Sequence, residues 1–347
     1  MKNRIIQFAS GFIAGDAISN EMTAIDNYFS KKGYETGIFA SFTAGSNEKK
    51  VKKSYKYVPE KNDILIYHHS IHSGLVEKIK KFDVKKVMVY HNVTPHHFFE
   101  LYDFKMSHYL KKGRDELAEM KDLFDKNLAV SRYNASELEA LGFSKVSVVP
   151  IIYDFSNLKK SAKKKSAIKN ILFVGRIAPN KKLDDLIRFA AIFRLMVTDS
   201  FKLTIVGYAP RELSLYKEEL DRMVDYYDLA KHVVFSGFVS DAELQNLYSQ
   251  ADLFLSLSEH EGFCVPVLES MYFAVPVLAY ECGVFKETLD GAGVLVKEKD
   301  FGRIALMAEK LLYDDGFRNS ILEGQNQRIA RYLELDPASL IEKEILN

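Results

Sequence analysis

The chain has 347 residues, of which 47% are hydrophobic and 27% charged, so it is long enough for about two globular domains. Its 18 glycines, 8 prolines and 2 cysteines exclude a collagen-like chain and a disulfide scaffold, and its hydrophobic content excludes disorder as the main state. The 48 Lys and Arg residues balance 47 Asp and Glu residues to a net charge of +1, so nucleic acid is not an expected partner.

The sequence favours a cytoplasmic protein. Cys264 and Cys282 have no CxxC partner and are expected to be reduced thiols. Asp16 interrupts the apolar N-terminal stretch, so a signal peptide is not expected, and no run of about 18 apolar residues predicts a membrane span. Peripheral contact with the inner membrane face is a hypothesis that depends on basic residues such as Lys49, Lys50, Lys52 and Lys53.

Short apolar runs that barely alternate recur along the chain, which is typical of parallel strands buried on both faces. The first series occupies residues 4–9, 63–68, 86–91, 128–131 and 146–150. The second series occupies residues 170–175, 202–207, 233–237, 253–258, 275–280 and 293–296. Amphipathic stretches such as 182–196 and 241–250 lie between them and indicate helices, so the sequence predicts an α/β fold of doubly wound parallel sheets.

One Lys- and Ser-rich segment, NLKKSAKKKSAIKN at 157–170, interrupts this alternation and predicts a solvated linker with a hinge near residues 152–169. Its lysines either keep the segment soluble or contact an anionic membrane surface or a phosphate-bearing acceptor. We therefore expect a first domain over 1–155, a linker over 156–169 and a second domain over 170–324. A C-terminal helix over about 325–347 is expected to pack back on the first domain.

Several common nucleotide-binding and catalytic signatures are absent. The sequence contains neither the GxxxxGK[ST] phosphate loop nor the GxSxG hydrolase elbow. Gly11 and Gly15 follow the first strand but do not complete GxGxxG. No Asp-x-Asp occurs, so a carboxylate pair that holds a divalent metal against a diphosphate is not indicated.

The segment 256–276, SLSEHEGFCVPVLESMYFAVP, carries the strongest signal. Glu261 and Glu269 are eight positions apart, and Pro266 suits the first turn of a helix that begins near Val265. The preceding loop would present free backbone N–H groups at the carboxyl end of a parallel strand. This arrangement predicts an anion site.

E-GFCVPVL-E, from Glu261 to Glu269, resembles the E-x7-E signature of retaining glycosyltransferases of family GT4, which have the GT-B fold. Residues 171–187 resemble the Gly-Arg-x4-Lys element of that family, and 203–210, 233–259 and 275–296 resemble its later elements. The resemblance covers about 170–315. Before residue 150 it is looser, and 15–20, 89–99 and 129–138 are similar to a bacterial polysaccharide-assembly branch.

The resemblance implies two Rossmann-like domains that face each other across a cleft, with acceptor-side residues in 1–155 and the nucleotide-sugar site in 170–324. It implies a retaining, metal-independent transfer of a sugar from a UDP- or GDP-type donor to a saccharide or lipid-linked acceptor in surface polysaccharide synthesis. No cofactor is expected, because the nucleotide-sugar is a substrate. The alternative is an inactive nucleotide-sugar-binding scaffold or sensor; an epimerase or phosphorylase is not indicated.

The resemblance also implies roles for individual residues. Arg176 and Lys181 would stabilise the leaving diphosphate without a metal. Glu269 would accept hydrogen bonds from the ribose, and Glu261 would lie beside the donor sugar. His91, at the end of a strand, would contact the sugar near the reacting carbon. The catalytic set is thus His91, Glu261, Arg176 and Lys181, and a front-face displacement is preferred to a covalent intermediate.

The expected donor-binding set is larger. Backbone groups of the loop after Glu261 would contact sugar and phosphate, and the segment after residue 237 would frame the base. The full set is Gly15, Gly175, Arg176, Lys181, Gly207, Phe238, Val239, Gly262, Phe263, Cys264, Val265 and Glu269. His68 is expected on the acceptor side, and a metal cluster of His68, His72, His96 and His97 is not favoured. Lys182, Cys264 and Ala274 stand where the family usually has Gly.

Overall fold

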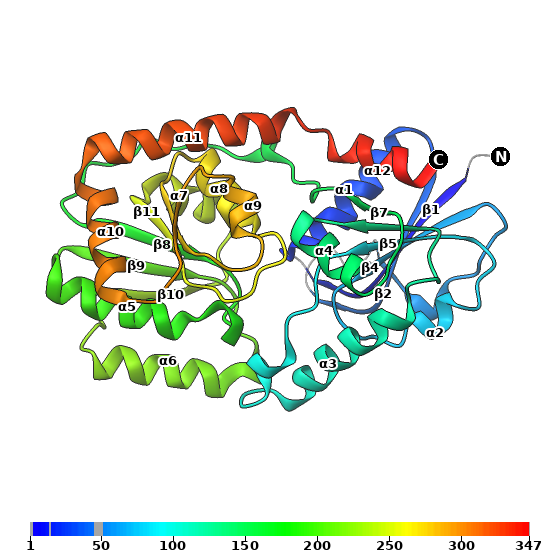
Figure 1. Ribbon diagram of the computed structural model, residues 1–347, viewed down its shortest axis with the longest axis horizontal. Helices are drawn as coiled ribbons and strands as arrows, with labels where there is room; N and C mark the ends of the chain where they lie inside the picture. The colour runs from blue at the N-terminus through cyan, green and yellow to red at the C-terminus, as the bar shows by residue number, and fades with distance from the viewer. Residues whose placement is uncertain (1–2, 14, 45–50, 347) are drawn as a thin grey trace. The chain divides into compact units, whose positions relative to one another are not determined.

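The computed structural model describes residues 3–13, 15–44 and 51–346. The chain forms two compact units (Figure 1). Unit 1 comprises Met1–His97, Phe104–Phe155 and Asp336–Asn347, and unit 2 comprises Phe98–Asp103 and Ser156–Leu335. The short segment 98–103 belongs to unit 2 because Tyr102 donates a hydrogen bond to Glu219 at 2.7 Å and packs against the ring of Tyr216.

Within the described residues, unit 1 contains a seven-stranded parallel sheet in the order β3-β2-β1-β4-β5-β6-β7. Its strands are β1 (Arg4–Ile13), β2 (Glu35–Ala44), β3 (Val51–Lys53), β4 (Asp63–His69), β5 (Lys85–Tyr90), β6 (Lys126–Ala129) and β7 (Val146–Val148). Its helices are α1 (Ala17–Lys31), α2 (Val76–Ile79), α3 (Phe104–Glu119), α4 (Arg132–Ala140) and α12 (Pro337–Leu346). Every residue of β4 is buried, which explains why that strand shows no alternation.

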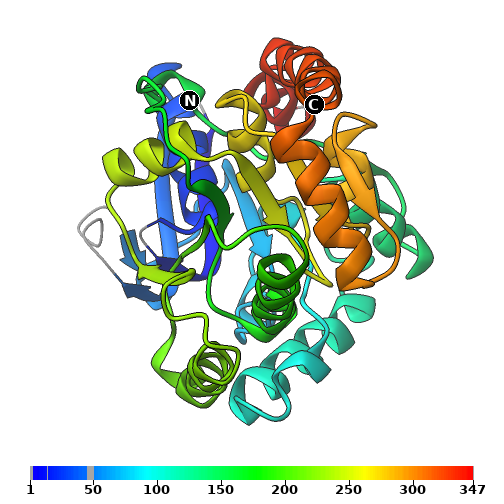
Figure 2. The ribbon, with the colours of Figure 1, turned by 90° about the vertical axis from the view of Figure 1, so that its left-hand side faces the viewer.

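Unit 2 contains a six-stranded parallel sheet in the order β10-β9-β8-β11-β12-β13, counted over the same described ranges. Its strands are β8 (Lys169–Val174), β9 (Phe201–Val206), β10 (Val233–Gly237), β11 (Leu253–Ser256), β12 (Val277–Tyr280) and β13 (Val294–Val296). Its helices are α5 (Leu183–Met196), α6 (Ser214–Tyr226), α7 (Asp241–Gln250), α8 (Val265–Tyr272), α9 (Phe285–Leu289), α10 (Phe301–Tyr313) and α11 (Asp315–Glu334). Helices α5 and α10 lie side by side (Figure 2).

Five short 3-10 helices complete the described secondary structure: Ser54–Lys56, His96–Phe99, Phe155–Asn157, Pro179–Lys181 and Arg211–Leu213. The two sheets confirm the predicted doubly wound α/β architecture. In each sheet the strand order reverses next to the first strand, between β1 and β4 and between β8 and β11. Ligands of open parallel sheets bind outside the carboxyl ends of the strands at such switch points.

The Lys- and Ser-rich segment expected to be a solvated linker is hydrogen-bonded to unit 2. Backbone N–H groups of Lys159 and Lys164 donate to the side-chain amides of Gln245 and Gln250 on α7, at 3.0 and 2.9 Å. Residues 158–168 of the segment lie outside the helices and strands, so these side chains take the place of a ladder and satisfy backbone donors there. The lysine side chains remain mostly exposed.

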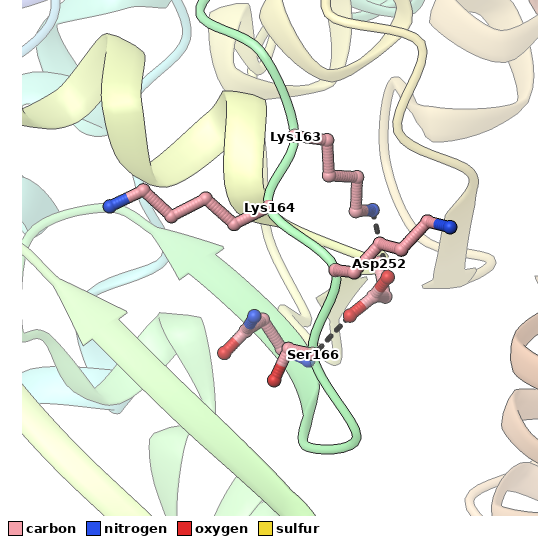
Figure 3. A pocket seen from close by; sticks show the side chains of 6 residues that line it. Lys163, Lys164, Ser166 and Asp252 are labelled. Atoms are coloured by element: carbon pink, nitrogen blue, oxygen red, sulfur yellow. Dashed lines mark hydrogen bonds and ion pairs between the residues drawn. The ribbon is translucent and has the colours of Figure 1, made fainter.

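Figure 3 shows a pocket where this segment passes the start of β11. Lys163 pairs with Asp252 at 2.7 Å, and the same carboxylate accepts a hydrogen bond from the backbone N–H of Asn170 at 2.8 Å. Burial lowers the pKa of the Lys163 ammonium group, and the ion pair with Asp252 opposes this shift. Lys163 therefore fastens the segment to unit 2, whereas Lys164 and Lys165 extend into solvent.

The C-terminal region is two helices instead of the single helix expected over 325–347. Helix α11 ends at Glu334, because Pro337 disfavours helical backbone at the residue before it. Helix α12 belongs to unit 1, where Glu342 accepts a hydrogen bond from Tyr28 at 2.7 Å and pairs with Lys32.

None of the described helices is long and apolar enough to cross a membrane. Of the lysines on which the membrane-contact hypothesis depends, Lys52 is exposed and Lys53 is half-buried. Lys49 and Lys50 lie outside the described residues.

The three positions where the resemblance expects Gly all have left-handed backbone. The φ angles of Lys182, Cys264 and Ala274 are 51°, 67° and 57°. A Cβ atom makes this conformation unfavourable by about 1 kcal/mol or more. Ala274 completes a Schellman motif after α8, with its N–H bonded to Met271 O at 3.0 Å and the next N–H bonded to Ser270 O at 2.8 Å.

We predict that Ala274→Gly stabilises the protein by about 1 kcal/mol, because glycine adopts the left-handed C-terminal position of a Schellman motif without steric cost. Ala135→Gly is the matched control, since Ala135 is buried inside α4, and it should destabilise by about 1 kcal/mol. Urea unfolding followed by circular dichroism measures both. Destabilisation by Ala274→Gly would contradict the assignment of strain to this position.

Candidate functional site

The carboxyl ends of β8 and β9 approach each other unusually closely. A Cβ atom on Gly207 would overlap the carbonyl oxygen of Gly175 and lie 3.2 Å from the backbone nitrogen of Arg176. Hydrogen bonds at 2.9 Å from Gly175 N to Val206 O and from Gly207 N to Gly237 O hold the backbones in this arrangement. The Arg176 side chain is left exposed and, among the described residues, makes no hydrogen bond or ion pair.

Asn180 places Lys181, the second predicted cation, next to the predicted carboxylate of Glu261. Its carbonyl oxygen accepts from Glu259 N at 2.9 Å, and its side-chain amide donates to His260 O at 3.2 Å. These bonds fasten the turn after β8 to the loop after β11. As a result, Lys181 Nζ lies 2.6 Å from Glu261 Oε2, although the two residues are 80 positions apart.

Lys181 and Glu261 form a shielded ion pair, because their side chains are 19% and 8% exposed. The neighbouring Lys182 turns instead to Asp184, at 3.1 Å. Lys181 is therefore the lysine that reaches the E-x7-E loop. Each of these lysines faces a carboxylate, whereas Arg176 has no ion pair among the described residues.

An ion-pair network that sequence reasoning missed supports the same loop. Lys299 donates to Asp185 on α5 and to Glu259 in the loop, both at 2.6 Å. Arg188 contacts Asp184 and Asp185 at 2.5 and 2.7 Å. The adjacent aspartates of the first turn of α5 were the available sequence signal, because acids are stabilising at that end of a helix.

Helix α8 begins at Val265, after Cys264 in left-handed backbone. Burial raises the pKa of the Cys264 thiol well above its usual range and that of Cys282 to about 12, so both free thiols stay protonated at neutral pH. Phe263 is buried, with its ring near that of Tyr332 and its carbonyl bonded to Thr288. Its side chain is thus part of the core.

Glu269 lies on the second turn of α8 and is 7% exposed. The Tyr248 hydroxyl donates to its Oε2 at 2.7 Å, and the Tyr248 ring stacks on Phe273. Sequence reasoning missed Tyr248, which lies inside α7 with no motif around it. The tyrosine holds one carboxylate oxygen of Glu269 in place.

The remaining predicted donor residues of unit 2 lie at the same sheet edge. Phe238 is 71% exposed and follows β10, and Val239 is half-buried beside it. Gly262 and Val265 are half-buried in the loop and first turn of α8. Of the predicted site residues, the structure brings Lys181 into direct contact with Glu261.

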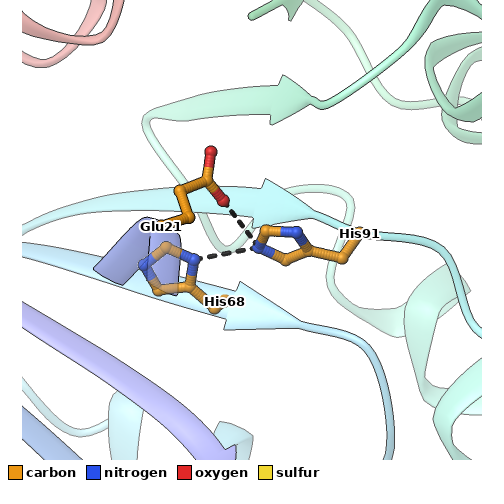
Figure 4. A group of neighbouring side chains, drawn as sticks. All are labelled: Glu21, His68 and His91. Carbon is orange, nitrogen blue, oxygen red and sulfur yellow. Dashed lines mark hydrogen bonds and ion pairs between the residues drawn. The ribbon is translucent and has the colours of Figure 1, made fainter. Parts of the chain in front are cut away.

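Unit 1 holds the other predicted residues. Gly15 follows β1 in left-handed backbone, with φ of 82°, and Asp16 caps α1 by accepting from Ser19 N at 3.3 Å. His91 follows β5 and is buried. Its Nε2 lies 2.9 Å from His68 Nδ1 and 3.6 Å from Glu21 Oε2, as Figure 4 shows.

Burial sets the protonation of this group. It raises the pKa of Glu21 to about 8, lowers that of His68 to about 3 and lowers that of His91 well below its usual range. All three side chains are consequently neutral at pH 7. Sequence reasoning missed Glu21 and its neighbour Gln7, which lie inside α1 and β1.

Ligand atoms of Glu21, His68 and His91 lie within 4.8 Å of one another, and over the described ranges this is the group close enough to hold a metal ion. The cluster of His68, His72, His96 and His97, which the sequence did not favour, is not assembled in the described residues. His72 instead contacts Glu116 at 2.5 Å. The expectation of no metal remains a prediction.

Residues 154–328, half of the chain, match the family described as "Glycosyl transferases group 1", and the chain belongs to this family. It is thus a member of a class of glycosyltransferase enzymes. An uncharacterized glycosyltransferase of Methanocaldococcus jannaschii is 32% identical over 197 residues, which cover 55% of this chain and 47% of that protein. O-antigen chain mannosyltransferase B of Escherichia coli is 26% identical over 147 residues, 42% of this chain and 38% of that protein.

The solved structures show the same GT-B fold. HepE of Anabaena, in complex with UDP-glucose, has a TM-score of 0.76 at 15% identity and covers 98% of this chain and 97% of its own. By contrast, the match to the two sequence relatives spans less than half of their length.

We predict that Gly207→Ala destabilises the protein by about 3 kcal/mol or more, because its Cβ overlaps the Gly175 carbonyl as well as requiring unusual backbone. Gly237→Ala is the control: Gly237 has φ of 66° but open space around a Cβ, so about 1 kcal/mol is expected. Urea unfolding distinguishes the two. Equal losses would show that the close approach at Gly207 is not the constraint described.

We predict that Glu21→Gln removes a pH-dependent loss of stability. The folded protein holds the Glu21 proton up to a pKa of about 8, against about 4.5 unfolded, so this stabilisation is complete at acid pH and is lost as pH rises through 8. At about 1.4 kcal/mol per pKa unit, the free energy of unfolding of the variant should rise by several kcal/mol relative to that of the wild type between pH 5 and 9. Any destabilisation by the substitution that does not depend on pH is added equally at every pH. Unfolding titrations across this range, with the exposed Glu119→Gln as control, measure the difference. A difference independent of pH would contradict the prediction.

Proposed function

We propose that this chain is a retaining glycosyltransferase that moves a sugar from a UDP- or GDP-type donor to a saccharide or lipid-linked acceptor in surface polysaccharide synthesis, in the cytoplasm at the inner membrane face. The observation that carries the proposal is the assembly at the carboxyl edge of the unit 2 sheet. There Lys181 and Glu261 pair at 2.6 Å, beside the exposed Arg176 and the α8 carboxylate of Glu269.

The cations of this edge suit a diphosphate leaving group. When the bond from the sugar carbon to the phosphate oxygen breaks, its electron pair leaves negative charge on the diphosphate. Arg176 offers a planar set of donors with no competing carboxylate, and Lys181, whose charge is balanced by Glu261, can donate further hydrogen bonds to the diphosphate. These two groups make a divalent metal unnecessary in the proposed reaction.

The carboxylates suit the neutral parts of the donor. Glu269, whose carboxylate is positioned by the hydrogen bond from Tyr248, is proposed to accept ribose hydroxyl hydrogens. Glu261 lies in the loop where the sugar is proposed to bind. In the preferred front-face reaction, the departing phosphate oxygen takes the proton of the acceptor hydroxyl. The oxygen of that hydroxyl bonds to the sugar carbon on the face from which the phosphate leaves.

The names of similar proteins support both base types. O-antigen chain mannosyltransferase B acts, by its name, on mannose in O-antigen, and a mycobacterial relative is named as GDP-mannose-dependent. HepE is solved with UDP-glucose. We therefore keep GDP and UDP as the two candidate nucleotides.

We predict micromolar binding of one nucleoside diphosphate, measured by calorimetry with UDP, GDP, ADP, CDP and dTDP in the presence of a chelator. Glu269→Ala and Arg176→Ala should each weaken it about 10- to 100-fold, since a hydrogen bond to a charged group contributes roughly 1.5–3 kcal/mol. The exposed side chains of Arg303 and Glu323 in the same unit provide matched alanine controls, expected within about twofold of wild type.

Four results would contradict the proposal at different points. Absence of binding, or unchanged binding by both variants, would remove the site. Binding that requires a divalent metal would remove the metal-independent reaction. Binding without transfer to acceptor membranes from the matching nucleotide-sugar would favour the scaffold or sensor, and an inverted anomer in the product would contradict retention.

A further inference from the structure

Three buried side chains of unit 1 form a hydrogen-bonded chain with a fixed direction. It runs from Gln7 on β1 through His68 on β4 to His91 after β5. Glu21 of α1 lies alongside His91, as Figure 4 shows. All four are less than a tenth exposed. Because these groups are shielded from water, they must find their hydrogen-bond partners among one another, and each donor determines the acceptor that it meets.

The direction is set at Gln7. Its side-chain amide Nε2 donates to Met22 O at 2.8 Å, so Oε1 is the atom that faces His68 Nε2, at 3.0 Å. Oε1 can only accept, and His68 Nε2 must therefore carry the ring hydrogen. A neutral imidazole has one ring hydrogen, so His68 Nδ1 is left as an acceptor.

The acceptor on His68 determines the state of His91. The 2.9 Å contact between His68 Nδ1 and His91 Nε2 needs one hydrogen, which must lie on His91 Nε2. Glu21 Oε2 lies 3.6 Å from the same nitrogen, beyond hydrogen-bond distance, and its Oε1 accepts from Ile152 N at 3.3 Å. His91 is thereby fixed as the tautomer with hydrogen on Nε2.

This tautomer leaves a buried lone pair on His91 Nδ1. That atom has no hydrogen-bond partner among the described residues, and Figure 4 shows it on the side of the ring away from Glu21 and His68. A buried acceptor without a partner is unfavourable, so the arrangement points to a donor supplied by a ligand. A sugar hydroxyl is a neutral donor of this kind.

We propose that Gln7 and His68 are positioning residues, which hold His91 as its Nε2–H tautomer so that Nδ1 accepts a hydrogen bond from a hydroxyl of the donor sugar. The inference rests on the proposed function for the identity of the ligand. It concerns the sugar and not the nucleotide, so nucleotide binding alone does not depend on it.

The adjacent His69 shows what a purely structural histidine looks like on the same strand. Its Nδ1 lies 3.2 Å from the Tyr67 hydroxyl and its Nε2 lies 3.1 Å from Gly113 O. Both nitrogens are satisfied within the protein. His69→Gln is therefore the matched control, with comparable burial and no side-chain hydrogen bond to His91; the backbone bond from His91 N to His69 O at 3.0 Å is retained in the variant.

The first test measures the tautomers directly by nitrogen-15 NMR of the histidine rings in the full-length protein. We expect His68 and His91 of the wild type to carry hydrogen on Nε2. Gln7→Met removes the fixed acceptor and should mix the tautomers of both rings, whereas Gln7→Glu retains an acceptor and should restore them. A wild-type His91 with hydrogen on Nδ1, or an unchanged tautomer in Gln7→Met, would overturn the proposal.

The second test separates sugar from nucleotide. With the nucleotide-sugar whose nucleotide binds in calorimetry, Gln7→Met and His68→Phe should lower kcat about tenfold, the effect of one lost hydrogen bond in the reaction. Affinity for the nucleoside diphosphate should stay within about twofold, and Gln7→Glu should recover activity. Equal loss of activity in His69→Gln would indicate a general effect of structure and overturn the proposal.

Failure of the two proposals would look different. Loss of all nucleotide binding in the wild type would remove the proposed function while the NMR result still decides the tautomer. Normal nucleotide binding with the wrong tautomer would remove only this inference. Metal analysis of the purified protein gives the remaining outcome: one tightly bound zinc ion per chain, lost in His91→Ala, would place a metal and not a hydrogen on Nε2 and overturn the proposal.

Discussion

The contact between Gly207 and the Gly175 peptide is the constraint on which the unit 2 site depends. With no side chain on Gly207, the ends of β8 and β9 lie close enough for the Gly207 position to touch the Arg176 backbone. The chain after β8 must then turn outward, which exposes Arg176 and carries Asn180 to the loop after β11. The pairing of Lys181 with Glu261 follows from that placement and not from local sequence.

Three buried glutamates illustrate how environment distinguishes residues of one type. Glu261 has a lysine at 2.6 Å, and Glu269 accepts from a tyrosine hydroxyl. Glu21 has neither, and burial raises its pKa to about 8. A buried carboxyl group without such a partner, as at Glu21, holds its proton at neutral pH. The two glutamates of the E-x7-E segment are consequently suited to accept hydrogen bonds, and Glu21 is suited to the neutral surroundings of His91.

The sequence was most informative where structure follows from short-range patterns. The apolar runs predicted parallel strands because every residue of a strand such as β4 is buried. Tyr248, Gln7 and Glu21 could not be found in this way, since each lies inside a regular element and gains its partner through strand or helix order. The attachment of residues 159–164 to α7 was equally hidden, because its partners, Gln245 and Gln250, follow about 85 positions later. Composition describes the solvation of a lysine-rich segment but not the acceptors that it meets.

The two units, each taken by itself, offer different chemistry to the proposed nucleotide-sugar. Unit 2 presents the exposed cation of Arg176, together with the ion pair of Lys181 and Glu261, and a cation suits a diphosphate. Unit 1 presents an uncharged histidine whose hydrogen is committed to His68, which suits a hydroxyl. A charged group at His91 would be costly to bury without a partner, so its neutrality is what allows it to lie beneath the surface. The buried Gln7 and His68 side chains therefore have one role in this proposal, which is to keep the hydrogen of His91 on Nε2 and leave Nδ1 as an acceptor.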